Sequence, residues 1–539
     1  MTDLPDWMLD TKTPPDVIVK NKPRKPVTDP TLGIPVVLQK EGTPRHRLVS
    51  IGDSLTHGFQ SGAIFLTQYS FPAIIAREMG WKEMRYPTYN SPDEGLPINL
   101  EKLARDIYNK FGSNINFWNL IPTLFFLQKW LDNNEKFWES GEGSHIPAEK
   151  EIYHNLATYG WDLRNTISCN ADICLQNIEK TKAKNNILRQ VVDNHSDRSA
   201  VRVLNSARDS NGKALTPPQA AAALSTEGSK ENGEGDGIET LIIAIGSNNA
   251  LGAMLTFKVA WSGDGYDDVD YNDRYTVWRP IHFKAELDLL VAEIHKIRAR
   301  HVIFATVPHV TIIPMSNGLG TKVAKGSRYF NNYTLPWIQE EDFQPNKHPN
   351  LTQQEVRAID SAIDQYNDYI VDVVREARQQ GKDWYVFELC GLLDRLAYRR
   401  YINDPEAQPD WWEELGGEYN LPEPLQKLSP VPNANFFTSD SNGRTNGGLF
   451  SLDGMHPTTI GYGIMAQEII KIMQLAGVKF YESDGVSERP GDVKIDFRRL
   501  LQEDTLLSNP PFVVGGIINL IRTIDKNFNL FSNLLRANY

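Results

Sequence analysis

Ser54 lies in a stretch whose residue types suit nucleophilic chemistry. An apolar run, Leu48–Ile51, is interrupted only by Ser50 and leads directly into Gly52, Asp53 and Ser54. This pattern predicts a buried strand followed by a sharp turn. A serine at that place lies at the carboxyl edge of an open α/β sheet, where ligand sites form, and its backbone N–H can face a developing anion. Helix capping by the same serine is an equal alternative when this segment is considered alone.

Asp453 and His456 are of the types that a serine nucleophile requires as partners. Acyl transfer by a serine needs a base within hydrogen-bond reach and a group that orients the base. His456 would take the proton of Ser54 and deliver it to the leaving group. Asp453, three residues earlier in the same loop, would fix the His456 tautomer and stabilise the imidazolium. Taken singly, each residue is more simply explained as a turn or capping residue.

Alternating strands and helices across 46–477 would position these groups. The patterns predict strands at about 48–52 and at 151–160, 239–246, 301–307 and 384–389. They predict helices at about 64–78, 171–205, 283–300, 352–381 and 457–477. Helices that alternate with strands predict a mainly parallel sheet between helices, as in α/β proteins. The carboxyl ends of the strands would then share one edge, where the candidate residues collect.

Four blocks of residues resemble those of the SGNH, or GDSL, hydrolase family. They are GDSLTHG at 52–58, NLATYG at 155–160, GSNN at 246–249 and DGMHPTTIGYG at 453–463, in the family's order. The resemblance implies a flavodoxin-like three-layer α/β/α sandwich, with a mainly parallel sheet and large helical and loop insertions. It also implies a serine esterase mechanism.

The resemblance assigns a role to each matching residue. Ser54 corresponds to the nucleophile, Asp453 to the acid and His456 to the base. The oxyanion hole would consist of the backbone N–H groups of Ser54 and Gly160 and the side-chain amide of Asn248. The candidates for lining the pocket are Asp53, His57, Asn249 and His309. Asn249 stands where the family usually has Asp, and His309, which follows Pro308 at another strand end, is more simply an ordinary loop residue.

Three segments extend or interrupt this core. Residues 1–45 are rich in Pro and Lys and predict an extended amino-terminal arm. A hydrolase domain at 46–477 would carry insertions at about 81–150, 207–237 and 391–450. The first is dense in aromatic residues and predicts helices that add a packing layer or cover an apolar pocket. Residues 207–237 predict a mobile surface loop with about one helical turn, and 311–350 predict a further loop.

The carboxyl-terminal extension, 478–539, carries a second kind of signal. Apolar residues from Ile517 to Leu535 recur at spacings of three and four, which predicts an amphipathic helix. Docking of this helix on the protein body is the simpler interpretation. Peripheral contact with a membrane surface is the alternative.

Composition limits the class of function. The 56 basic and 68 acidic residues give a formal net charge of −12, which argues against a nucleic-acid partner. Three cysteines without a metal-ligand grouping indicate either a reducing compartment or simple use in the core. No apolar run reaches the roughly 18 residues of a transmembrane segment, and the start has no signal-peptide pattern. We therefore expect a cytoplasmic location.

These observations predict a serine hydrolase that cleaves carboxylic esters through an acyl-enzyme, without a metal or organic cofactor. The aromatic insertion and the tail helix favour a lipase or acylhydrolase acting on a small-molecule or lipid ester with an apolar acyl group. A carbohydrate O-acetylesterase and an acyltransferase with the same triad are alternatives, because both share the first half-reaction. A catalytically silent ligand-binding protein is the alternative from another class.

Overall fold

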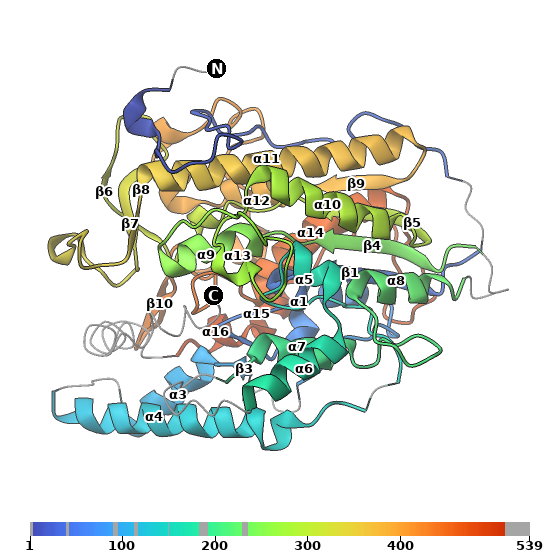
Figure 1. Cartoon of the computed structure of the whole chain (residues 1–539), viewed down its shortest axis with the longest axis horizontal. Coiled ribbons are helices and arrows are strands. Elements are labelled where there is room, and N and C mark those ends of the chain that lie inside the picture. Colours follow the sequence, from blue (N-terminus) through green and yellow to red (C-terminus); the bar gives the residue numbers. More distant parts are fainter. Residues whose placement is uncertain are drawn as a thin grey trace.

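A four-stranded parallel sheet lies at the centre of the protein (Figure 1). The computed structural model describes residues 4–38, 42–89, 95–112, 117–148, 150–182, 192–228 and 235–511. The sheet has the order β1 (His46–Gly52), β4 (Ile238–Ala244), β5 (Ala299–Ala305) and β9 (Trp384–Phe387). Each neighbouring pair is parallel. The prediction of an α/β protein with a mainly parallel sheet is therefore confirmed.

Helices cover both faces of this sheet, because its strands are apolar on both sides. Successive residues of β1 enter different cores: Val49 packs on one face and Leu48 on the other. The Val49 face is covered by α5 (Leu163–Ser168), α8 (Pro217–Ser225), α10 (Pro280–Ile294) and α11 (Gln353–Gln379). The Leu48 face is covered by α2 (Phe71–Glu78) and α14 (Thr459–Leu475).

The ends of the longest helix follow local sequence signals. Thr352 and Glu355 form a capping box at the start of α11, as their spacing predicts. Gly381, with φ +80°, follows the last turn and allows the chain to leave the helix. In Figure 1, α11 runs along the top of the molecule, and the amino-terminal arm lies beside it. The arm is held there by bonds from Ile18 N to Gln365 Oε1 (2.7 Å) and from Lys20 N to Ser361 Oγ (3.1 Å).

Two elements near the first strand differ from the prediction. The expected helix at 64–78 is confined to α2, because Ser70 caps it and Pro72 occupies its first turn. The chain before it forms the short helix α1 (Ser54–His57) and the strand β2 (Ala63–Ile64), which pairs with β3 (Leu96–Pro97). The expected strand at 151–160 is reduced to a single parallel bridge between Asn155 and Ser50 of β1. Backbone bonds from Ser50 N to the His154 carbonyl (2.9 Å) and from Leu156 N to the Ser50 carbonyl (2.8 Å) support this bridge. The Asn155 side chain also bonds to the carbonyl of Thr56 (2.9 Å).

Two expected loops contain regular structure. Within 207–237, α8 begins with a capping box formed by Thr216 and Gln219 and buries alanine side chains against the sheet. Within 311–350, β6 (Asn317–Lys322) and β7 (Phe330–Thr334) form an antiparallel pair, which β8 (Asn350–Thr352) extends. The expected helix at 171–205 is described as α6 (Ala171–Lys182) and α7 (His195–Leu204). These elements are stabilised by packing against the rest of the protein. Local sequence patterns carry no information about that packing.

The remaining helices and strands include both buried and outer elements. In the first insertion, α3 (Leu100–Phe111) and α4 (Phe117–Glu139) lie at the lower edge of the view in Figure 1. The other elements are α9 (Asn248–Thr256), α12 (Leu389–Asp394), α13 (Glu423–Gln426), β10 (Thr438–Asp440), β11 (Gly443–Asn446), α15 (Phe497–Glu503) and α16 (Thr505–Ser508). The amphipathic helix predicted between Ile517 and Leu535 lies outside the described residues. Within the described ranges, no helix has the length and apolar character needed to cross a bilayer.

Candidate active site

Ser54 and His456 are 402 residues apart in the chain, yet their side chains are within hydrogen-bond distance. Ser54 Oγ lies 2.9 Å from His456 Nε2. On the other side of the ring, His456 Nδ1 lies 3.0 Å from Asp453 Oδ2. All three side chains are buried. A hydroxyl, an imidazole and a carboxylate in this order form the arrangement by which a serine is activated as a nucleophile.

The turn after β1 positions the Ser54 hydroxyl. Gly52 is needed there, because a Cβ would collide with Thr56 and with the Ala244 carbonyl of the neighbouring strand. Asp53 caps α1 by accepting a bond from Leu55 N (3.1 Å). Burial raises the pKa of Asp53 to about 6, although the Leu55 N–H acts in the opposite direction. Asp53, a candidate for lining the pocket, is thus the capping residue of α1, the helix that begins at Ser54.

Backbone N–H groups of the loop before α14 and of Gly62 hold the Asp453 carboxylate beside His456. Asp453 Oδ1 accepts bonds from Met455 N (2.8 Å) and His456 N (2.9 Å), and Oδ2 accepts one from Gly62 N (2.9 Å). Burial acts to raise the pKa of Asp453, but His456 and these donors outweigh it and hold the pKa below its ordinary value. The carboxylate is therefore ionised and can orient the imidazole.

The candidate oxyanion donors come from three segments. Among the residues that the structure describes, the backbone N–H groups of Ser54 and Gly160 donate to no acceptor. Gly160 has φ +79°, a conformation that favours glycine. Asn248, in the first turn of α9, donates from Nδ2 to the carbonyl of Trp161 (2.7 Å), the residue after Gly160. An amide nitrogen has a second N–H, so this contact leaves one donor of Asn248 available.

Two other predicted residues have different surroundings. Asn249 Oδ1 accepts a bond from Leu163 N (3.3 Å) and so holds the start of α5. His57 is fully buried, and its ring lies 6.2 Å from that of Tyr159 and 6.3 Å from that of Tyr89. Neither of its nitrogens has a hydrogen-bond partner in the described part of the chain. Burial lowers the pKa of His57 to about 3, so this imidazole is neutral.

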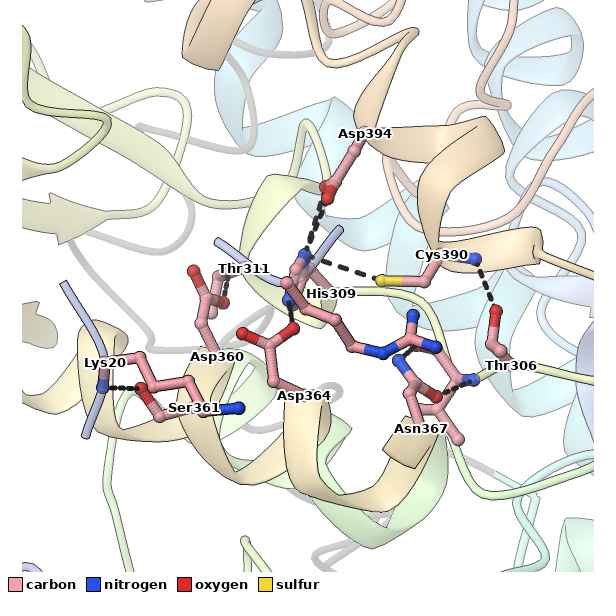
Figure 2. A network of polar contacts seen from close by, with 12 residues as sticks. Lys20, Thr306, His309, Thr311, Asp360, Ser361, Asp364, Asn367, Cys390 and Asp394 are labelled. Carbon is pink, nitrogen blue, oxygen red and sulfur yellow. Dashed lines mark hydrogen bonds and ion pairs between the residues drawn. The ribbon is translucent and has the colours of Figure 1, made fainter. Parts of the chain in front are cut away.

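His309 belongs to a buried polar network and is not an ordinary loop residue (Figure 2). Its Nδ1 lies 3.0 Å from Asp394 and 3.6 Å from Cys390 Sγ, and its Nε2 lies 3.2 Å from Asp364. Burial acts to lower the pKa of His309, but the carboxylates outweigh it and hold this pKa well above its ordinary value. The described hydrogen bonds of His309 do not include Ser54, Asp453 or His456.

Part of this network has the residue types of a metal site. The candidate ligand atoms of His309, Cys390 and Asp394 lie within 4.8 Å of one another. Both ring nitrogens of His309 already face carboxylates, so an imidazolium satisfies the group without a metal ion. The cluster could not be predicted from the sequence, because no metal-ligand spacing connects His309 with Asp364, Cys390 and Asp394.

Several residues that support the site escaped the sequence analysis. The Phe59 ring lies 4.5 Å from the ring of His456, and the Phe59 carbonyl accepts a bond from Tyr462 Oη (2.5 Å). Ser451 Oγ accepts a bond from Ser61 N (2.7 Å) and so joins the loop of Asp453 and His456 to the segment after α1. Tyr462 lies within the block at 453–463, which is the only signal that could have pointed to one of them.

Comparison with known proteins identifies no relative. The chain matches no family model, and no curated protein is significantly similar to it. The functional assignment therefore depends on the geometry of the site.

Proposed function

We propose that this protein is a serine hydrolase that cleaves carboxylic esters through an acyl-enzyme. The observation that carries the proposal is the chain of contacts from Ser54 Oγ to His456 Nε2 (2.9 Å) and from His456 Nδ1 to Asp453 Oδ2 (3.0 Å). In this proposal His456 removes the proton as Ser54 attacks the ester carbonyl. The imidazolium, stabilised by Asp453, then protonates the leaving alcohol, and water releases the acid in the second half-reaction.

The same proposal includes membership of the SGNH hydrolases and their flavodoxin-like sandwich. The parallel sheet with helices on both faces is compatible with that fold. The N–H groups of Ser54 and Gly160 and the Asn248 amide would stabilise the anion of the tetrahedral intermediate. Two observations support this role. The three donors come from segments next to β1 and β4, and the N–H groups of Ser54 and Gly160 have no acceptor in the described chain.

An apolar acyl group is the substrate feature that the surroundings of the base support best. Phe59 contacts His456, and its ring lies 4.8 Å from that of Tyr159. Trp138, from α4 of the aromatic insertion, belongs to the same buried apolar cluster. The insertion therefore packs on the side chains that surround the base. An acyl chain that binds against this apolar cluster is stabilised because apolar surface is removed from water.

Reaction with a fluorophosphonate probe and turnover of p-nitrophenyl esters test the proposal. The Ser54→Ala variant should lose both the adduct and turnover, because no other group supplies the nucleophile. Ser487→Ala is a matched control, because Ser487 lies in an exposed loop and bonds to Asp484. Turnover by Ser54→Ala at the rate of the unmodified protein would refute the proposal.

The same assays separate the alternatives. An absence of adduct on Ser54 in the unmodified protein would favour a silent binding protein. A panel of esters with acyl chains from acetyl to dodecanoyl should show a preference for the longer chains. A preference for acetylated sugars would indicate a carbohydrate esterase, and product formation only with an added alcohol would indicate a transferase.

A further inference from the structure

A small, partly open cavity lies beside the segment that follows β5, and its lining does not include Ser54 or His456. Its volume is about 30 Å³, more than the ~10–15 Å³ that one water molecule requires. The polar residues that line it come from that segment, from the β6–β7 hairpin and from the chain after α12. They are Thr311, Ser316, Arg328, Tyr333, Arg399 and Arg400.

Two of the three arginines in the cavity wall have no carboxylate as a hydrogen-bond partner. Arg328 is only 4% exposed; its Nη1 lies 3.4 Å from Tyr401 Oη, while its Nε and Nη2 have no partner among the described residues. Arg399 bonds to two neutral groups, the Asn317 side chain and the Gly318 carbonyl. Burial lowers the pKa of Arg399, as expected for a cation that lacks a counter-charge.

The neighbouring carboxylates already have other partners. Asp360 pairs with Arg400, the third arginine of the wall, at 2.9 Å. Asp364 and Asp394 face the two nitrogens of His309, as Figure 2 shows.

A fourth arginine lies behind the cavity wall and adds to the positive charge. Arg357 is 2% exposed and lies 4.3 Å above the Tyr329 ring, and its hydrogen bonds within the described ranges go to the neutral side chains of Asn21 and Gln353.

Burial acts to lower the pKa of Arg328, but the surrounding Tyr329, Tyr401, Asp360 and Asp364 outweigh it and hold this pKa well above its ordinary value, so the guanidinium is charged. Its Nε and Nη2 nevertheless have no acceptor among the described residues. Buried donors without an acceptor are costly, which favours an added anion that accepts from them.

We propose that this cavity is a binding site for a small oxyanion, namely a phosphate or carboxylate group, held by Arg328, Arg399 and Arg400. Planar guanidinium groups bind such oxygens with paired N–H donors. Ser316 Oγ, which is buried and has no partner in the described chain, adds a hydroxyl donor. The next residue along, Met315, donates from its N to the Gly454 carbonyl (2.9 Å), so the site adjoins the loop of Asp453 and His456.

Isothermal titration calorimetry of the full chain tests the proposal without reference to ester hydrolysis. Inorganic phosphate, phenyl phosphate and acetate are titrated separately at low ionic strength, and chloride serves as the non-oxyanion control. We expect saturable one-to-one binding of at least one oxyanion with a Kd of about 1 mM or lower. Tighter binding of phenyl phosphate than of phosphate would identify the group as part of a larger molecule, and tighter binding of acetate would identify a carboxylate.

Arginine variants connect binding to the cavity. Arg399→Gln should weaken binding roughly tenfold or more by removing one charged donor pair. Arg328→Gln should have at least the same effect, but Arg399 is half-buried and gives the variant that is more certain to fold. Arg395→Gln is the matched control, because the Arg395 guanidinium bonds to the Gly417 carbonyl (2.7 Å) and is not part of the cavity wall. The absence of saturable binding, or equal binding by Arg399→Gln and the unmodified protein, would overturn the proposal.

Discussion

The substitution Asp453→Asn removes a charge and converts one acceptor of the carboxylate into a donor. Both carboxylate oxygens are fully used: Oδ1 accepts from Met455 N, His456 N and Ser451 Oγ (3.3 Å), and Oδ2 accepts from Gly62 N and His456 Nδ1. All of these partners except the Ser451 hydroxyl are N–H donors. An amide of the same shape must therefore turn its NH₂ toward one of the two sets.

The two orientations of the amide have unequal costs. With its nitrogen at the Oδ1 position, the amide leaves two backbone N–H groups facing a donor, each at about 1–3 kcal/mol. With its nitrogen at the Oδ2 position, it leaves only Gly62 N without an acceptor, and His456 Nδ1 must become the acceptor. The second orientation is the less costly one. It moves the ring proton to Nε2, which then cannot accept the proton of Ser54.

We expect kcat/KM for a p-nitrophenyl ester to fall by about 10⁴, the scale of a triad whose histidine has the wrong tautomer. This factor corresponds to about 5.4 kcal/mol of lost transition-state stabilisation. Near-ultraviolet circular dichroism would verify that the variant is folded. The matched control is Asp504→Asn, since Asp504 is also a buried capping residue but bonds to Ile460 N (3.1 Å) and not to His456. A loss of less than tenfold in Asp453→Asn would refute the reasoning.

Two further predictions concern stability. Burial raises the pKa of Asp504 to about 7, so the folded state binds its proton more tightly than the unfolded state does. The free energy of unfolding should therefore fall by a few kcal/mol as the pH rises from about 4 to about 7, and Asp504→Asn should flatten this dependence in urea titrations. A slope that is the same in both proteins would contradict this assignment. For Gly160→Ala, a Cβ has room, since the nearest atom is 3.6 Å away, but φ is +79°. Thermal unfolding should show a loss of about 1–2 kcal/mol, and a variant as stable as the unmodified protein would argue against the strain.

Local sequence signals were sufficient where one segment determines its own conformation. The strand β1 was predictable because its residues are apolar on both faces, as a central parallel strand requires. The start and the end of α11 were predictable because Thr352, Glu355 and Gly381 act on the nearest turns. By contrast, α8 and the β6–β7 hairpin were predicted as loops, since their stability comes from packing against distant parts of the chain.

For the candidate site, the sequence by itself determined the chemical types and the local frame: a serine after a strand, and an aspartate three residues before a histidine. It did not determine their separation in space. Only the tertiary structure brings Ser54 within 2.9 Å of His456 and puts Gly62 N on the Asp453 carboxylate. The arginine cavity likewise has no signal along the chain, because its charges come from segments about 70 residues apart and meet only after folding. Short-range patterns record what a residue does to its neighbours, whereas burial and charge balance depend on the whole fold.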